Sequence, residues 1–151
     1  LSVGVGMALA GRLDRRDYRV YVCLGDGELE EGEVWEAAMA AAHYRLDRLC
    51  AIVDFNGLQI DGRIQDTLNP VPIPAKWKAF GWDVCEIDGH DFRQIIRALD
   101  WAAGPKGKPS AIVARTVKGK GVSFMEAQVN WHGVAPCADE ARRALAELGE
   151  S

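Results

Sequence analysis

The sequence lacks an excess of basic residues, an apolar run of membrane length and a recognisable targeting segment. Its 151 residues include 18 Lys and Arg against 22 Asp and Glu, so the net charge of -4 gives no reason to expect nucleic-acid binding. No apolar run approaches the roughly 18 residues that a membrane span needs, and no signal-peptide pattern is present. We therefore expect neither a nucleic acid nor a membrane as a partner.

Closely spaced cysteines are also missing. The sequence has no CxxC pair, and its four cysteines lie too far apart for a zinc knuckle or a redox motif. Cys23, Cys50 and Cys85 stand in apolar runs typical of strands, and Cys137 lies near the end of the chain. The simplest prediction is reduced core thiols in a cytoplasmic protein.

A dinucleotide-binding GxGxxG motif is absent as well. Gly4 and Gly6 do not form one, because position 9 is Leu and no strand precedes them. A nicotinamide-binding domain is therefore disfavoured. The segment favours instead a helix that packs closely through small residues, with an apolar pattern at Val3, Met7, Ala10 and Leu13. The chain has no initiator Met, so its start looks like a cut within a longer structure.

Apolar runs that end in turn residues alternate with helical stretches. Buried strands are expected within residues 18–27, 49–57, 82–90 and 108–119. Helices are expected within residues 33–46, 76–80, 91–104 and 138–148. Asp91 should cap the third of these helices, and Gly104-Pro105 should end it. The pattern predicts an α/β fold, a mostly parallel doubly wound sheet with helices on both faces, as a single domain over residues 1–151.

Two of the predicted strands end in polar residues. The first ends in Gly25-Asp26-Gly27, and the second ends in Asp-Phe-Asn with the asparagine at position 56. A right-handed crossover makes such strands parallel, so their carboxyl ends open on the same edge of the sheet. Asp26 and Asn56 should therefore lie close together, at the edge where open α/β sheets bind ligands.

The glycine turn around Asp26 would let a phosphate approach the backbone, but the carboxylate itself would repel that phosphate. Further acids crowd the same turn, namely Glu28, Glu30, Glu31 and Glu33. A hard divalent cation removes the conflict if it binds Asp26, the Asn56 amide oxygen and a nearby backbone carbonyl on one side, and phosphate oxygens on the other. We therefore predict a metal-bridged diphosphate.

Lys118 and His132 are further candidates in the segment after the last strand. Lys118 follows that strand's carboxyl end and could neutralise a phosphate, although a solvated loop lysine is an equal alternative. His132 stands between Trp131 and Gly133 and could donate to a phosphate or carry a proton. For His43 and His90 a structural role is expected.

Three segments together resemble the transketolase family. They are GDGELEEGEVWEAAMAAAHYRLDRLCAIVDFNGLQIDG at 25–62, TVKGKGVSFME at 116–126 and WHGVAP at 131–136. The first is similar to the thiamine diphosphate motif, a GDG followed after about thirty residues by Asn. The resemblance covers essentially the whole chain. It is strongest to the N-terminal, diphosphate-binding (PP domain) subunit of split transketolases, which implies the thiamine-diphosphate-binding fold without its N-terminal portion.

The resemblance implies thiamine diphosphate and Mg²⁺ (or Ca²⁺) as cofactors. Metal ligands would be Asp26, Asn56 and the backbone oxygen of Leu58. Diphosphate contacts would come from the Gly25 to Gly27 turn and, more loosely, from Lys118. Ile60 matches a residue packed against the thiazolium, His132 an active-site histidine near the diphosphate and the reacting end of the substrate, and Glu31 an acid of an interface glutamate network.

By family chemistry, such an enzyme transfers a two-carbon ketol unit between sugar phosphates. The glutamate that activates the aminopyrimidine belongs to a pyrimidine-binding domain, which in split enzymes is a separate C-terminal subunit. The resemblance therefore implies a homodimer or heterotetramer with that partner, and inactivity of this chain alone. Two alternatives stay open: an enzyme similar to deoxyxylulose-phosphate synthase, and a non-catalytic assembly module that keeps the fold.

Overall fold

The computed structural model of the chain describes residues 1–104 and 106–149. Its centre is a parallel sheet in the order β1-β2-β6-β5. The strands are β1 (Val20–Gly25), β2 (Leu49–Phe55), β5 (Asp83–Asp88) and β6 (Ser110–Arg115). All four lie within the runs predicted as strands. Pro105, expected with Gly104 to end a helix, lies outside the described residues.

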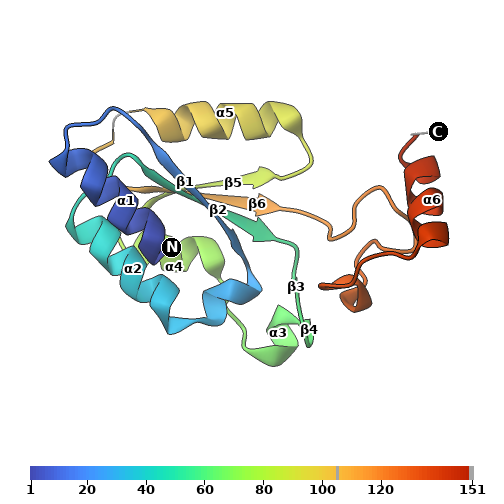
Figure 1. Cartoon of the computed structure of the whole chain (residues 1–151). Helices are drawn as coiled ribbons and strands as arrows, with labels where there is room; N and C mark the ends of the chain where they lie inside the picture. The colour runs from blue at the N-terminus through green and yellow to red at the C-terminus, as the bar shows by residue number, and fades with distance from the viewer. Residues whose placement is uncertain (105, 150–151) are drawn as a thin grey trace.

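Helices cover both faces of the sheet (Figure 1), as the sequence predicts. On one face lie α1 (Ser2–Leu13), α2 (Gly32–His43) and α4 (Ile73–Ala79), and on the other lies α5 (Phe92–Ala103). Asp91 caps α5 as expected, because its Oδ1 accepts hydrogen bonds from the backbone N–H groups of Arg93 and Gln94. The predicted α/β class and doubly wound arrangement are thus confirmed.

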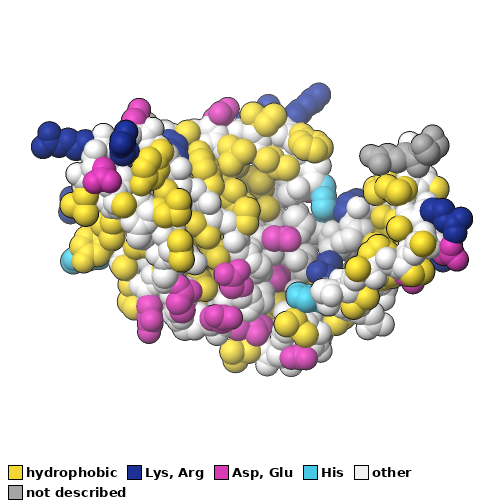
Figure 2. Space-filling model, viewed as in Figure 1, with side chains coloured by type: hydrophobic (Ala, Val, Ile, Leu, Met, Phe, Trp, Pro, Cys, Tyr) yellow, Lys and Arg dark blue, Asp and Glu magenta, His cyan; other side chains and the backbone are white. Residues whose placement is uncertain are grey.

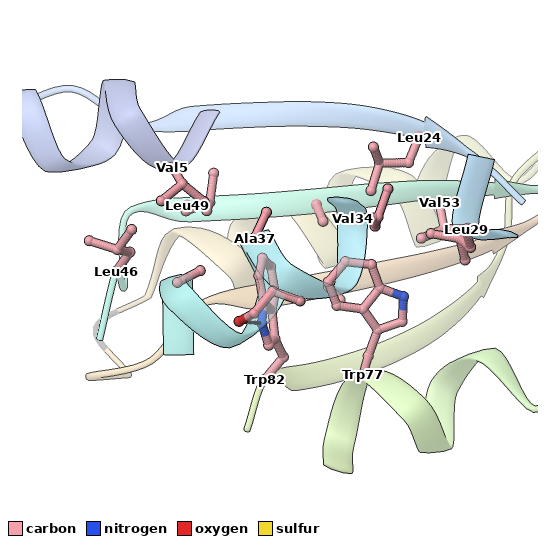
Figure 3. Close-up of a cluster of buried hydrophobic side chains, with 14 of the residues drawn as sticks. Val5, Leu24, Leu29, Val34, Ala37, Leu46, Leu49, Val53, Trp77 and Trp82 are labelled. Atoms are coloured by element: carbon pink, nitrogen blue, oxygen red, sulfur yellow. Dashed lines mark hydrogen bonds between the residues drawn. The ribbon is translucent and has the colours of Figure 1, made fainter. Parts of the chain in front are cut away.

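The larger core lies between the sheet and the three helices on the first face (Figure 3). Alanines of α2, at positions 37, 38 and 41, are at most 5% exposed and let the helix approach the strands. Trp77 of α4 and Trp82 are both buried, with ring centroids 4.6 Å apart in an edge-on arrangement. Burial of side chains this large makes a major contribution to holding the layers together.

A smaller core lies under α5 on the second face, around Cys50, Ala98, Ala102 and Ile112. This core does not extend over β1, where Tyr21 is 45% exposed and Cys23 is also exposed. The prediction of core thiols is therefore right for Cys50, half right for the partly buried Cys85, and wrong for Cys23 and Cys137. Cys23 is exposed because it faces outward from an edge strand whose second face α5 does not cover.

Helix α1 forms as predicted, but the buried face is not the expected one. The large apolar residues of the pattern are turned outward: Val3 is 79% exposed, Met7 52% and Leu13 81%. The buried positions are Gly4, Val5, Ala8 and Gly11. A Cβ on Gly4 would stand 2.5 Å from Val22 Cγ2, so the helix approaches β1 as closely as only glycine allows. Close packing through small residues is the part of the expectation that holds.

Three short elements follow β2 and were not predicted. They are β3 (Leu58–Gln59) and β4 (Gly62–Arg63), which pair as an antiparallel hairpin, and α3 (Ile64–Thr67). The chain beyond β6 contains a 3₁₀ turn η2 (Val129–Trp131) and helix α6 (Ala138–Glu147). Figure 1 shows this last part of the chain extending to one side of the sheet. Among the described residues, no helix is both long and apolar enough to cross a membrane.

Candidate functional site

The candidate site lies at the carboxyl ends of β1 and β2, at one edge of the parallel sheet. The strands are in register up to the pair Gly25 and Asp54, and the Asp26 N–H then donates to the Asp54 carbonyl at 3.2 Å. The chain next enters η1 (Gly27–Glu30), a short 3₁₀ helix with Asp26 at its N-cap. Pairing of β1 with β2 therefore fixes the backbone position of Asp26 at the edge of the sheet.

Asp26 is a buried carboxylate, only 1% exposed. Its Oδ1 accepts from Gly27 N–H at 2.8 Å, and its Oδ2 accepts from Gly57 N–H at 2.5 Å. The second bond joins the end of β1 to the turn after β2, which brings Asp26 beside Asn56 as the sequence predicts. Burial raises the pKa of Asp26 above its ordinary value, and the hydrogen bonds from Gly57 and Gly27 oppose that shift.

Asn56 and Leu58 sit in the turn that leads into the β3–β4 hairpin. The Leu58 N–H donates to Asn56 Oδ1 at 3.1 Å, and Ile64 N–H donates to the Gly57 carbonyl at the same length. Gly57 has a φ of +80°, a conformation that glycine adopts without strain. The turn is thus held from both sides, and an amide oxygen has a second lone pair that this hydrogen bond leaves unused.

A cavity of about 550 Å³ opens above these groups. It brings together every residue predicted for the site: Gly25, Asp26, Gly27, Glu31, Asn56, Leu58, Ile60, Lys118 and His132. Lys118 and His132 come from the segment after β6 and are far from Asp26 in sequence. The size is typical of a small-molecule or cofactor pocket.

Four further residues line the cavity, namely Glu28, Glu30, Asp54 and Gln59. The sequence pattern groups Glu30 with the neighbouring glutamates and predicts no separate role for it. Glu30 Oε1 is buried and has no hydrogen-bond partner among the described residues. With Asp26, Glu31 and the other acids, the cavity has five carboxylates against one lysine and one histidine. Figure 2 shows acidic side chains gathered along the lower centre of this view of the molecule.

This donor set suits a hard divalent cation that also binds phosphate. Mg²⁺ and Ca²⁺ take oxygen ligands from carboxylates, amides and backbone carbonyls, and Mg²⁺ is usually bound by one or two carboxylates together with substrate phosphates. Among the described residues, no cluster of three or more His, Cys, Asp or Glu side chains could hold a metal.

Gly27 allows the β3–β4 hairpin to lie close to the turn that follows β1. A Cβ at this position would stand 2.6 Å from Gln59 Cβ, so the hairpin packs directly against the glycine turn. Ile60, at the tip of the hairpin, is 69% exposed and lines the same cavity. The cavity is thus lined by polar residues together with the exposed, apolar Ile60.

Several known proteins are similar to this chain in sequence and fold. Residues 8–151 match the family described as "Transketolase, thiamine diphosphate binding domain". An apulose-4-phosphate transketolase subunit of Phocaeicola vulgatus is 45% identical over 150 residues, which cover 99% of this chain and 53% of that protein. The 6-deoxy-6-sulfo-D-fructose transketolase subunit SqwG of a Clostridium species is 46% identical over 148 residues, 97% of this chain and 54% of that protein.

The fold is likewise that of solved transketolases. The crystal structure of transketolase from Campylobacter jejuni matches with a TM-score of 0.88 and 32% identity, over 99% of this chain and 24% of that one. Transketolase from Leishmania mexicana matches with the same TM-score and 30% identity, over 99% of this chain and 24% of that one. The chain spans about half the length of these two curated relatives, and about a quarter of the two solved chains.

Proposed function

Since the chain belongs to the family of transketolase thiamine diphosphate-binding domains, we propose that it is the diphosphate- and metal-binding part of a transketolase. This enzyme would transfer a two-carbon ketol unit between sugar phosphates. The observation that carries the proposal is the buried Asp26 carboxylate, which shares a cavity with Asn56, Leu58 and Lys118. The same arrangement supports residues 1–151 acting as one cofactor-binding unit.

Three oxygens of the chain would hold Mg²⁺ or Ca²⁺: a carboxylate oxygen of Asp26, the amide oxygen of Asn56 and the backbone oxygen of Leu58. The fit rests on what surrounds Asp26. Its hydrogen bonds come from two backbone N–H groups, and burial raises its pKa, so a cation there would relieve an unfavourable buried charge. Only one formal charge comes from this ligand set, which leaves the cation positive enough to attract a diphosphate.

The diphosphate would lie against the glycine turn and Lys118. Gly25 and Gly27 carry no side chains that would separate a phosphate from the backbone, and Lys118 is the lysine that lines the cavity within the described residues. The remaining cavity acids would repel an anion without a metal. Cofactor binding should therefore require the divalent cation.

Within this site His132 would hydrogen-bond the diphosphate or the reacting end of the substrate and could hold a proton there. Ile60 would pack against the thiazolium ring, since an exposed apolar side chain at the cavity rim gains by contact with a flat aromatic group. Glu31, at the N-cap of α2 and exposed, would meet a partner surface. Bound thiamine diphosphate would supply the nucleophilic carbon and the electron sink for the C–C bond change.

A second polypeptide with a pyrimidine-binding domain would complete the enzyme. Two relatives of nearly equal identity are named as transketolase subunits, and their names give different sugars. The proposal therefore takes from them the reaction class and the need for a partner, and it assigns sugar phosphates only as a class. A homodimer or heterotetramer in the cytoplasm, acting in pentose phosphate metabolism, fits this role.

Reconstitution with a pyrimidine-domain subunit tests the proposal. The chain alone, given thiamine diphosphate, Mg²⁺ and a ketose phosphate donor with an aldose phosphate acceptor, should produce no ketol transfer. Addition of the partner subunit should produce it. Ketol transfer by the chain without a partner would contradict the proposal that a second subunit completes the enzyme. Use of pyruvate in place of the ketose donor would instead support an enzyme similar to deoxyxylulose-phosphate synthase.

A further inference from the structure

The last part of the chain, residues 116–149, forms an extension that we call the arm (Figure 1). Many of its hydrogen bonds are internal. Ala127 N–H donates to the Lys118 carbonyl at 2.9 Å, Trp131 Nε1 donates to the Phe124 carbonyl at 3.0 Å, and Ser123 Oγ donates to Glu147 at 2.9 Å. The arm also carries both Lys118 and His132 of the candidate site. Its orientation therefore decides whether two site residues face the cavity.

Hydrogen bonds join the arm to the rest of the protein at its root. Thr116 N–H donates to the Phe55 carbonyl at 3.1 Å, and the Thr116 hydroxyl donates to Asp54. Val117 N–H donates to His90 Nε2 at 2.8 Å. Among residues 1–104 and 106–149, which the structure describes, no hydrogen bond or ion pair joins arm residues after Val117 to the rest of the protein. The His90 bond is thus the last polar attachment before Lys118.

His90 is itself held firmly in the turn between β5 and α5. Its backbone N–H donates to Asp88 Oδ1 at 2.9 Å, and the neighbouring Gly89 N–H donates to the Arg115 carbonyl at 2.7 Å. A Cβ on Gly89 would stand 2.4 Å from Thr116 Cγ2, so the turn packs directly against the end of β6. The bond from Val117 requires an Nε2 that carries no proton, which leaves Nδ1 as the protonated nitrogen of a neutral ring.

We infer that His90 is a positioning residue for the cofactor site: it fixes the root of the arm and so keeps Lys118 and His132 over the cavity. A peptide bond joins Val117 to Lys118, so release of the Val117 N–H frees the backbone at the site itself. The inference rests on the proposed function where it concerns cofactor affinity. Loss of one such hydrogen bond corresponds to an affinity change of about 2- to 12-fold.

The test compares His90→Leu, which removes the acceptor, with His90→Gln, whose side-chain oxygen can take the place of Nε2. His43→Leu is the matched control, because His43 lies at the end of α2 and packs edge-on against Tyr44, with ring centroids 4.9 Å apart. Two quantities are measured: hydrogen exchange of the Val117 amide in the chain, and the affinity of the complex with its partner subunit for thiamine diphosphate in the presence of Mg²⁺.

His90→Leu should speed exchange of the Val117 amide and weaken cofactor binding by about 2- to 12-fold. His90→Gln should restore both, and His43→Leu should change neither. Faster exchange with unchanged affinity would overturn the positioning role. Unchanged exchange in His90→Leu would overturn the attachment itself. If the wild-type complex binds no cofactor, the proposed function fails, whereas the exchange measurement still decides whether His90 fixes the arm.

A measurement on the unmodified protein covers the case in which His90→Leu does not fold. NMR should detect a coupling across the hydrogen bond between the Val117 amide nitrogen and His90 Nε2, with an unprotonated Nε2. Observation of a protonated Nε2 at neutral pH, with no such coupling, would overturn the inference without any substitution.

Discussion

Gly27→Ala should damage the site through a single added methyl group. The new Cβ would stand 2.6 Å from Gln59 Cβ, whereas carbon atoms in contact are about 3.5 to 4.0 Å apart. The neighbour must therefore move by about 1 Å. That neighbour is the base of a side chain on the two-residue strand β3, so the backbone of the hairpin has to shift rather than a flexible side-chain end.

Movement of the hairpin would displace the Leu58 carbonyl on one side of Gln59 and Ile60 on the other. Overpacking of this kind costs about 1 to 3 kcal/mol. If this free-energy cost reduces the stability of the cofactor complex, the affinity for thiamine diphosphate falls roughly 5- to 150-fold. Isothermal titration of the Mg²⁺-loaded complex with the partner subunit measures this, and chemical denaturation of the chain measures any loss of folding stability.

Gly32→Ala is the matched control, because a Cβ at that position meets nothing within 4 Å. It should bind the cofactor as the wild type does. If Gly27→Ala and Gly32→Ala bind equally well, then the close contact between the glycine turn and the hairpin does not shape the cofactor site, and the reasoning is wrong.

Two other predictions concern the core. Trp82 Nε1 donates to the Ala38 carbonyl at 2.9 Å, whereas Trp77 Nε1 is buried and has no partner in the part of the chain that the structure describes. Trp82→Phe should therefore lower the free energy of unfolding by about 1 kcal/mol more than Trp77→Phe, and equal losses by chemical denaturation would contradict this. Burial raises the pKa of Cys50 to about 12, so at pH 8 a thiol reagent should label Cys23 and Cys137 quickly and Cys50 only on unfolding; rapid labelling of Cys50 in the native protein would refute its burial.

The sequence predicts the sheet and the closeness of Asp26 to Asn56 because both follow from the pattern of strands and their connections. Apolar runs that end at glycine mark β1 and β2, and parallel crossover then brings Asp26 and Asn56 together. The position of Lys118 follows from the same rule, since it stands just beyond the end of β6. Each of these inferences needs only the ends of the strands and the right-handed crossover that joins parallel strands. None needs the packing of particular side chains.

The features that sequence reasoning missed depend on contacts between distant residues. The outward face of α1 carries its largest apolar residues because Gly4 and Gly11 are needed where the helix meets β1 and Tyr18. The hairpin of β3 and β4 is too short to leave an alternating pattern. The hydrogen bond to His90 comes from a backbone N–H 27 residues away, and no pattern around His90 indicates it.

The central claim is that Asp26 binds a metal ion that bridges the protein to a diphosphate. The test is a titration of thiamine diphosphate into the complex with the partner subunit, once with Mg²⁺ and once with a chelator. It compares the wild type with Asp26→Ala and with Asp100→Ala, a control at an exposed position. Asp26→Ala should lose Mg²⁺-dependent binding by more than the roughly 10- to 100-fold typical of changes around a metal ligand, while circular dichroism shows that it folds and Asp100→Ala binds normally. A folded Asp26→Ala protein with the wild-type, Mg²⁺-dependent titration would contradict the claim.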